Sequence, residues 1–311
     1  MASTANKYAY QAFGLHITSD IALPELLPIV QQREEPDVDI RIEDLTGSWD
    51  ESLFRNSHYA GGEGQVFFNL PGIANVRIRD GSEIVVSPVA GSDENQIRLY
   101  VLGSCMGALL MQRKVLPLHG SAVVINGKAY AFIGESGAGK STIAATCVSQ
   151  GYSLVSDDVI AVTLSEAGEP VVTPSYPQQK LWQESLQGLG MGTALYAPLY
   201  GGVNKYAIPV KSGFSSEPVP LGGIYELVPV GSGTTIRRLQ GLEPLPALRV
   251  HTYRGLLIPV MNLEKWHFHM TASIASKSEM YQVRRTTAEF APERLLEQIL
   301  GTIFVEEGQR S

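Results

Sequence analysis

One short stretch, residues 129–142, constrains this chain more than any other. It reads Ala-Tyr-Ala-Phe-Ile-Gly-Glu-Ser-Gly-Ala-Gly-Lys-Ser-Thr and contains the pattern G-x-x-x-x-G-K-[ST] between Gly134 and Ser141. The apolar residues before Gly134 predict a strand, and residues 141–150, followed by Gly151, predict a helix. The same pattern also occurs as an ordinary glycine-rich turn that caps a helix. Strand, loop and helix in this order are the context that a phosphate-binding loop requires.

The residue types in this stretch suit the binding of a nucleoside triphosphate. Glycines let the backbone turn tightly and direct successive N–H groups into one concavity, which fits a β-phosphate. The following helix adds its positive N-terminal end, Lys140 reaches the β- and γ-phosphates, and the Ser141 hydroxyl binds Mg²⁺. We therefore predict ATP and Mg²⁺ as cofactors. The predicted cofactor-binding residues are Gly134, Glu135, Ser136, Gly137, Ala138, Gly139, Lys140, Ser141 and Thr142.

Length and composition indicate a chain that can bury a large core. It has 311 residues, 44% hydrophobic and 18% charged, so we expect one large or two ordinary domains. The net charge of −7 predicts no binding to nucleic acid or to an anionic membrane. The N-terminus lacks the apolar core of a signal peptide, and the longest apolar stretch, 99–111, is too short to span a bilayer. We expect a cytoplasmic protein in which Cys105 and Cys147 are reduced.

The pattern along the chain predicts an α/β protein with two parts. Alternating apolar and polar residues, as at 38–42, predict a β-rich N-terminal domain over residues 1–96. A connecting helix is expected over 97–114, and residues 115–311 are expected to form the domain that carries the glycine-rich stretch. The sequence leaves open whether the protein forms a homo-oligomer.

Two adjacent acidic residues follow the predicted phosphate-binding loop. Residues 152–156 and 159–164 read as strands, and Asp157 and Asp158 lie between them. Alone, such a pair is typical of a solvated surface turn. Beside a phosphate-binding loop it suits phosphoryl transfer, in which one carboxylate orients the acceptor hydroxyl and another holds Mg²⁺.

The segment after residue 174 is expected to begin as a helix and continue as a loop. The helix would open at residues 175–177 and contain Lys180, Trp182 and Glu184. Residues 188–213 are rich in glycine and interrupted by prolines, so we expect an irregular lid over the nucleotide.

The last third of the chain is expected to add strands and a closing helix. His267 and His269 fall on a predicted strand, where the absence of a third ligand disfavours a zinc site. Other predicted strands are 223–228, 235–239 and 280–283, and the closing helix is 292–300.

Taken together, these motifs resemble the kinase domain of the HPr kinase/phosphorylase family. The resemblance rests on Leu118-His119-Gly120, the glycine-rich stretch and residues 155–159, which occur in the family's order and spacing. It covers about residues 115–165 well. It implies a P-loop-containing, HPr-kinase-like core preceded by the β-rich N-terminal domain, and an activity that phosphorylates serine with ATP.

The resemblance also implies roles for individual residues. Asp157 takes the position of the family's catalytic base, Asp158 of its neighbouring acid and His119 of an active-site histidine. The implied metal ligands are Ser141, Asp158 and Glu184. The family's second signature, a glutamate shortly before Arg-Gly-x-Gly, is degenerate here. The sequence therefore leaves open whether the reverse phosphorolysis occurs.

Two further segments resemble a subfamily of HPr-kinase homologues. These are residues 10–15 and residues 175–182. Some members are encoded with lasso-peptide biosynthesis and phosphorylate the C-terminal serine of the precursor peptide, which implies a lasso precursor as partner and acceptor. Two alternatives stay open. The same chemistry could act on a free amino acid or a folded carrier protein, or the chain could be a nucleotide-gated binding module that transfers no phosphate.

Overall fold

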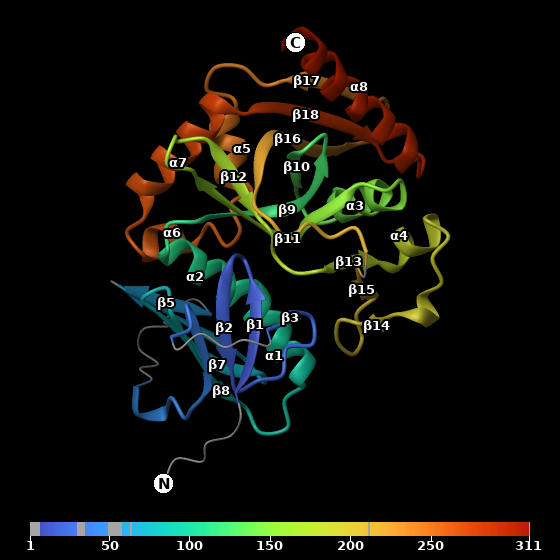
Figure 1. The fold of residues 1–311 in the computed structure, drawn as a ribbon. Helices are drawn as coiled ribbons and strands as arrows, with labels where there is room; N and C mark the ends of the chain where they lie inside the picture. The colour runs from blue at the N-terminus through green and yellow to red at the C-terminus, as the bar shows by residue number, and fades with distance from the viewer. Residues whose placement is uncertain (1–6, 30–34, 49–57, 63, 211, 311) are drawn as a thin grey trace.

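The computed structural model describes residues 7–29, 35–48, 58–62, 64–210 and 212–310. Within these ranges the protein is a mixed α/β structure with an eight-stranded, a seven-stranded and a three-stranded sheet. We call them the N-terminal, central and small sheets. In Figure 1 the N-terminal sheet is blue and lies below the central sheet, while the small sheet, in olive, stands beside both.

The N-terminal sheet contains the described strands that precede residue 89, in the order β3-β1-β2-β4-β8-β7-β6-β5. The alternation predicted at 38–42 is confirmed over residues 38–41, where Val38 and Ile40 are buried and Asp39 and Arg41 are partly exposed, but Ile42 is exposed. The strands are β1 (Tyr8–Ala12), β2 (Leu15–Ser19), β3 (Leu27–Pro28), β4 (Val38–Ile42), β5 (Tyr59–Gly62), β6 (Gln65–Leu70), β7 (Ala74–Arg79) and β8 (Glu83–Pro88), with a short 3₁₀ turn, η1, at Thr46–Ser48.

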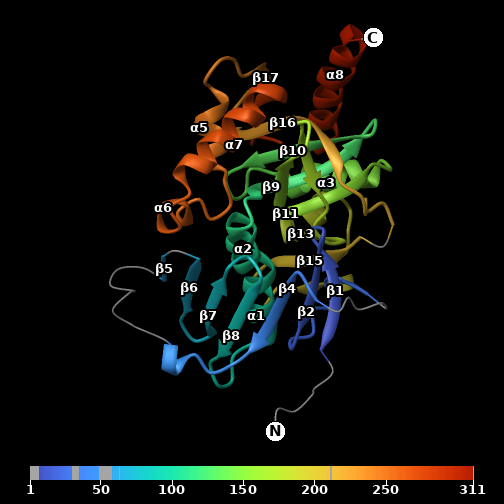
Figure 2. The same cartoon turned by 60° about the vertical axis from the view of Figure 1, so that its left-hand side comes forward.

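A helical segment connects this sheet to the rest of the protein. It consists of α1 (Glu94–Tyr100), the π-helical segment η3 (Val101–Cys105) and α2 (Met106–Gln112). The Asp93 side chain caps α1 by accepting a hydrogen bond from the Asn95 main-chain N–H at 2.9 Å. The apolar residues of this connecting segment share one core with residues of the N-terminal sheet and with Val159 and Leu257. In Figure 2 the segment lies between the two larger sheets.

The central sheet has the order β10-β9-β11-β12-β16-β18-β17, and β10 also pairs in parallel with β16. A hairpin at Asn126-Gly127 joins β9 to β10, with positive φ at both residues. The strands are β9 (Leu116–Ile125), β10 (Lys128–Gly134), β11 (Ser153–Leu164), β12 (Pro170–Thr173), β16 (Val219–Val230), β17 (Thr235–Arg238) and β18 (Glu279–Thr286).

Helices cover the central sheet. The two helices α3 (Lys140–Ser149) and α8 (Pro292–Arg310) pack together through an apolar cluster that includes Ile143, Cys147 and Leu296. Three further helices lie between β17 and β18 in the chain: α5 (Pro244–Val250), α6 (Leu257–Val260) and α7 (Glu264–Lys277). None of the helices in the described part of the chain is both long and apolar enough to cross a bilayer. Cys105 and Cys147 are free and buried.

The small sheet corrects the prediction for the segment after residue 174. Residues 178–182 form a strand, β13 (Gln178–Trp182), so Lys180 and Trp182 are not helical; the helix α4 (Gln183–Gly188) begins only afterwards and contains Glu184. Consecutive burial at 179–181 explains the strand, because both of its faces are covered. The predicted lid also contains regular structure, namely η4 (Thr193–Leu195), β14 (Ala197–Pro198) and β15 (Lys205–Pro209), and the sheet order is β13-β15-β14.

Two other expectations are wrong. His267 and His269 lie on helix α7 instead of a strand, and His267 is buried with its Nε2 atom 2.8 Å from the Thr252 hydroxyl. Asp157 and Asp158 do not form a turn between two strands, because both belong to the continuous strand β11. Pairing of β11 with β9 runs through this position and keeps the chain extended on either side of it.

Candidate functional site

The glycine-rich loop (residues 134–140) joins the end of β10 to the start of α3. Gly134 has φ +151°, and a Cβ atom there would lie 2.6 Å from the Leu227 carbonyl oxygen of β16. Gly137 and Gly139 have φ of +80° and +98°, in the left-handed region that glycine adopts without strain. The loop therefore depends on glycine for close packing and for its turn geometry.

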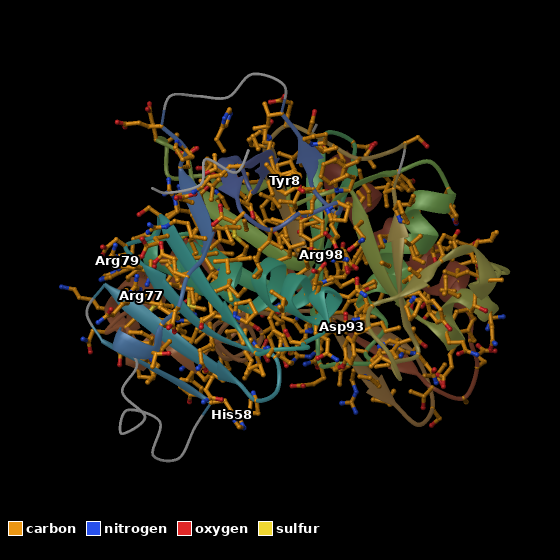
Figure 3. All side chains as sticks on the ribbon, turned by 90° about the horizontal axis from the view of Figure 1, so that it is seen from below. Tyr8, His58, Arg77, Arg79, Asp93 and Arg98 are labelled. Atoms are coloured by element: carbon orange, nitrogen blue, oxygen red, sulfur yellow. The ribbon has the colours of Figure 1, made fainter. Side chains whose placement is uncertain are left out.

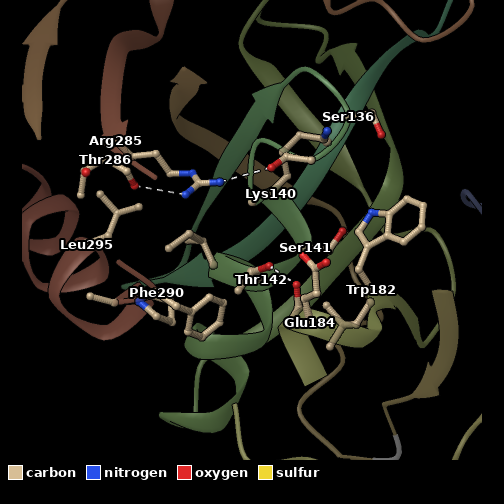
Figure 4. A pocket seen from close by; sticks show the side chains of 18 of the residues that line it. Ser136, Lys140, Ser141, Thr142, Trp182, Glu184, Arg285, Thr286, Phe290 and Leu295 are labelled. Carbon is tan, nitrogen blue, oxygen red and sulfur yellow. Dashed lines mark hydrogen bonds between the residues drawn. The ribbon is translucent and has the colours of Figure 1, made fainter. Parts of the chain in front are cut away.

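Two cations bind the main-chain carbonyl groups of this loop. Lys140 donates from Nζ to the Glu135 carbonyl oxygen at 2.8 Å. Arg285, on β18, donates from Nε to the Ala138 oxygen at 2.6 Å and from Nη2 to the Gly137 oxygen at 3.2 Å. Figure 4 shows the Arg285 guanidinium reaching toward the loop. Within the loop, the Ala138 N–H donates to the Glu135 carbonyl oxygen at 3.1 Å. Successive N–H groups in a loop of this kind form a concavity that suits an anion.

Lys140 is almost buried, with 8% of its surface exposed. Burial lowers its pKa to about 8, and the nearby charge of Lys205 on β15 adds to this effect. A polyphosphate at the loop would favour the charged amine, so binding of an anion here is coupled to protonation of Lys140.

Asp157 lies beneath the site. Its side chain is only 2% exposed. One carboxylate oxygen accepts a hydrogen bond from the Ser121 hydroxyl at 2.5 Å, and the other accepts one from the main-chain N–H of Lys180 at 2.6 Å. These bonds tie β11 to β9 and to the small sheet, so Asp157 links three strands.

Asp158 faces the site and is held by two basic residues. Lys180 donates from Nζ to Asp158 Oδ2 at 2.6 Å, and His119 Nδ1 lies 3.6 Å from Oδ1 and 3.1 Å from the Asp158 carbonyl oxygen. The residue has φ +73°, a left-handed conformation that is uncommon for a residue with a side chain. Such conformations concentrate at functional sites.

The charges around Asp158 set its protonation state and those of its neighbours. Burial would raise the pKa of Asp158, but the charges of Lys180 and Lys205 outweigh burial and hold the pKa well below its ordinary value. Burial and the charge of Lys140 lower the pKa of His119. At neutral pH the site therefore holds an ionised carboxylate beside a neutral imidazole.

A cavity of about 270 Å³ joins these groups. Figure 4 shows Trp182 and Glu184 on one side of it, and Arg285 and Phe290 on the other. Of the predicted site residues, those that line it are His119, Ser136, Gly137, Gly139, Lys140, Ser141, Thr142, Asp158 and Glu184. Gly134, Glu135 and Ala138 belong to the same loop, and Asp157 is buried behind the cavity.

The candidate metal ligands are too few for a metal that is coordinated by protein side chains alone, but they suit Mg²⁺. Among the described residues, no three His, Cys, Asp or Glu side chains converge as a metal site. Ser141, Asp158 and Glu184 nevertheless line the same cavity. Thr142 and Ser185 lie 2.9 Å apart, hydroxyl to hydroxyl, which fixes α4 against α3 next to Glu184. Mg²⁺ commonly takes one or two protein ligands and completes its shell with phosphate and water.

Sequence reasoning gave no role to several residues of this cavity. Arg285 and Phe290 come from the end of the chain, and Phe290 packs against Gly188 of α4. Lys180 was expected on a helix without a role. Lys205, a loop lysine that could contact phosphate on the sequence alone, also lines the cavity, with its Nζ atom 5.5 Å from the Trp182 ring centroid. Single residues without a local motif leave no signal in one sequence, and only the fold brings them together.

Comparison with known proteins gives a limited likeness to solved structures. No family model and no curated protein matches the chain. Among solved structures, the Hpr(Ser) kinase/phosphatase from Coxiella burnetii aligns with a TM-score of 0.34 and 12% sequence identity, over 61% of this chain and 98% of that chain. At this score the likeness says nothing of function, which is inferred below from the residues of the cavity.

Proposed function

We propose that this protein is a kinase that transfers the γ-phosphate of ATP to a serine hydroxyl. The observation that carries the proposal is that one cavity is lined by the glycine-rich loop, by Lys140 and by the ionised carboxylate of Asp158. A polyphosphate donor and a hydroxyl acceptor need these two kinds of group side by side.

The donor end of the site would bind the phosphates. The loop N–H groups and the N-terminus of α3 hold the β-phosphate, and Lys140 exchanges its bond to the Glu135 carbonyl for one to the phosphates. Arg285 keeps the loop carbonyls in place while this happens. Fixed positive groups of this kind stabilise the charge that develops on the transferring phosphoryl group.

The acceptor end of the site would orient the serine. We assign this role to Asp158, because its carboxylate lines the cavity while Asp157 is buried and bonded at both oxygens. The serine oxygen bonds to the γ-phosphorus as the bond to the β–γ bridging oxygen breaks, ADP leaves, and the hydroxyl proton goes to water. A carboxylate of low pKa acts here mainly by orienting the hydroxyl.

The residues present fit a Mg²⁺ ion. Ser141 and Glu184 would hold it together with the phosphates, and Asp158 is a further ligand candidate. The ion, when bound, neutralises charge on the phosphates.

We further propose that the acceptor is a flexible peptide that ends in serine, such as a lasso precursor. Support comes from the sequence resemblance at residues 10–15 and 175–182. Incubation with ATP and Mg²⁺, followed by mass spectrometry, should show one added phosphate on the terminal serine of such a peptide. Free serine and a folded carrier protein serve as competing acceptors. Stronger labelling of either would change the acceptor, and ATP binding without labelling of any acceptor would favour a nucleotide-gated binding module.

A further inference from the structure

A second cavity, of about 300 Å³, shares Lys180 with the first. Its walls come from helix α1, from the turn after β2 that contains Glu25, and from β13, β14 and β15 of the small sheet. Figure 3, which views the protein from below, shows Arg98 of α1 in this region. None of the motifs found in the sequence falls at this cavity, apart from the segment that carries Lys180.

Lys180 is common to both cavities. Its side chain is 5% exposed, and its Nζ atom is bound to Asp158 at 2.6 Å. The charge of Lys180 also acts on Tyr176, which lines the second cavity. An occupant of the second cavity would therefore lie against the side chain that holds the acceptor-facing carboxylate.

The lining of the second cavity combines apolar surface with one polar end. Leu99, Leu195 and Pro198 supply apolar contacts, and Leu195 is 79% exposed. At the polar end, Arg98 donates to Glu25 Oε1 at 2.9 Å and to Asn95 Oδ1 at 2.6 Å. Glu25 Oε2 is buried without a hydrogen-bond partner among the described residues. A small rotation of this carboxylate would offer the oxygen to an N–H group of a ligand.

One wall of the second cavity is a run of consecutive residues that includes an edge strand. Residues 195–199, which line the cavity, include β14, the last strand in the order of the small sheet. Peptides commonly bind along the edge of a sheet, where main-chain hydrogen bonds supply affinity and pockets select side chains. A free amino acid would leave most of this apolar wall uncovered.

We propose that the second cavity is the acceptor site and binds an extended peptide with apolar side chains before its serine. This inference rests on the proposed kinase function and adds where the acceptor binds. The peptide lies between α1 and β14, its main-chain N–H groups face the Glu25 carboxylate, and its serine passes Lys180 to reach Asp158.

The test is a matched pair of substitutions in the full chain. Ala197→Trp places a large ring in the second cavity from an exposed position of β14, and Ala194→Trp places the same ring nearby, at an exposed position of η4 that does not line it. The probe is a short fluorescein-labelled peptide with apolar residues before a terminal serine. Fluorescence anisotropy is measured with Mg²⁺ and a non-hydrolysable ATP analogue.

We expect Ala197→Trp to raise the peptide Kd about tenfold or more, and Ala194→Trp to leave it unchanged. Leu195→Ser, at a largely exposed side chain, provides a second variant that should weaken binding without affecting folding. Absence of peptide binding by the unmodified protein, or unchanged binding by both cavity variants, would overturn the proposal. Phosphate transfer to the peptide is measured in parallel. If the peptide binds but is not phosphorylated, only the proposed kinase function is contradicted. If the peptide is phosphorylated and neither variant slows this, only the proposed acceptor site is contradicted.

Discussion

Asp157 and Asp158 are adjacent in the chain, but their carboxylates meet different surroundings. Asp157 is enclosed and accepts two hydrogen bonds, whereas Asp158 turns into the cavity through its left-handed conformation. The sequence motif could predict that a pair of carboxylates acts here, because the motif is local. It could not predict which one faces the substrate, because that depends on β9 and β13.

The first prediction separates these two carboxylates. Asp158→Asn removes the charge at the acceptor, so turnover should fall about 10²–10⁴-fold while ATP affinity persists. Asp157→Asn places an amide donor against the Ser121 hydroxyl or the Lys180 N–H, and we expect a loss of about 1–3 kcal/mol of unfolding free energy. Turnover, isothermal titration with ATP and urea denaturation measure these effects. If Asp157→Asn lost more turnover than Asp158→Asn and kept its stability, the catalytic base would be Asp157, as the family resemblance implies.

The second prediction concerns Lys140 and pH. Because burial lowers its pKa to about 8, the free protein loses this positive charge as the pH rises through that value. A bound polyphosphate raises the pKa again, so ATP binding near pH 8 should take up protons and the affinity should fall above pH 8. Isothermal titration in buffers of different ionisation enthalpy measures the uptake.

Lys140→Arg is the matched control, since arginine stays charged throughout this range. Its ATP affinity should be lower at pH 7 but nearly constant up to pH 9. If the unmodified protein shows the same flat profile, Lys140 does not titrate in this range and the proposed coupling is wrong.

Single elements were predictable where their pattern is local. The hairpin β9–β10 and the alternation of β4 follow from turn residues and from period-two burial. Strand β13 was mistaken for a helix, because its consecutive buried residues carry no alternation and its partner β15 lies more than twenty residues away. Pairing with a distant strand overrides local preference there.

The third prediction belongs to the N-terminal sheet. Glu83 of β8 is buried and forms ion pairs with Arg41 of β4 and with Arg77 and Arg79 of β7. Glu83→Gln would leave three arginines close together without their common partner. We expect a loss of about 2 kcal/mol in unfolding free energy, less than for a fully buried pair, because Arg79 is 48% exposed.

The matched control is Glu43→Gln. Glu43 pairs with Arg41 at 2.9 Å but is 41% exposed, so we expect a change of at most about 0.5 kcal/mol. Urea denaturation of both variants measures the difference. Equal losses would mean that the pairs at Glu83 contribute no more than a surface ion pair.

At the scale of the whole molecule, the N-terminal sheet and the central sheet share a core. The connecting segment packs on residues of both, including Val159 of β11 and Leu257 of α6. The Tyr253 ring, from the segment between α5 and α6, also packs on the connecting segment, since a Cβ atom at Gly107 of α2 would lie 2.7 Å from it. The predicted division into residues 1–96, 97–114 and 115–311 therefore describes segments of sequence that are not independent in packing.

The last prediction follows from this shared core. A fragment of residues 115–311 would expose Val159 and Ala161 of β11 and the apolar side of α6, so we expect it to unfold at a lower temperature than the full chain or to aggregate. The full chain should melt in one transition, and ATP with Mg²⁺ at about 100 times its Kd should stabilise the whole of it by roughly 2.7 kcal/mol. Calorimetry measures both. If the full chain melts in two transitions and ATP shifts only one of them, the N-terminal sheet folds independently of the nucleotide site. A 115–311 fragment that is as stable as the transition that ATP shifts would contradict the shared core.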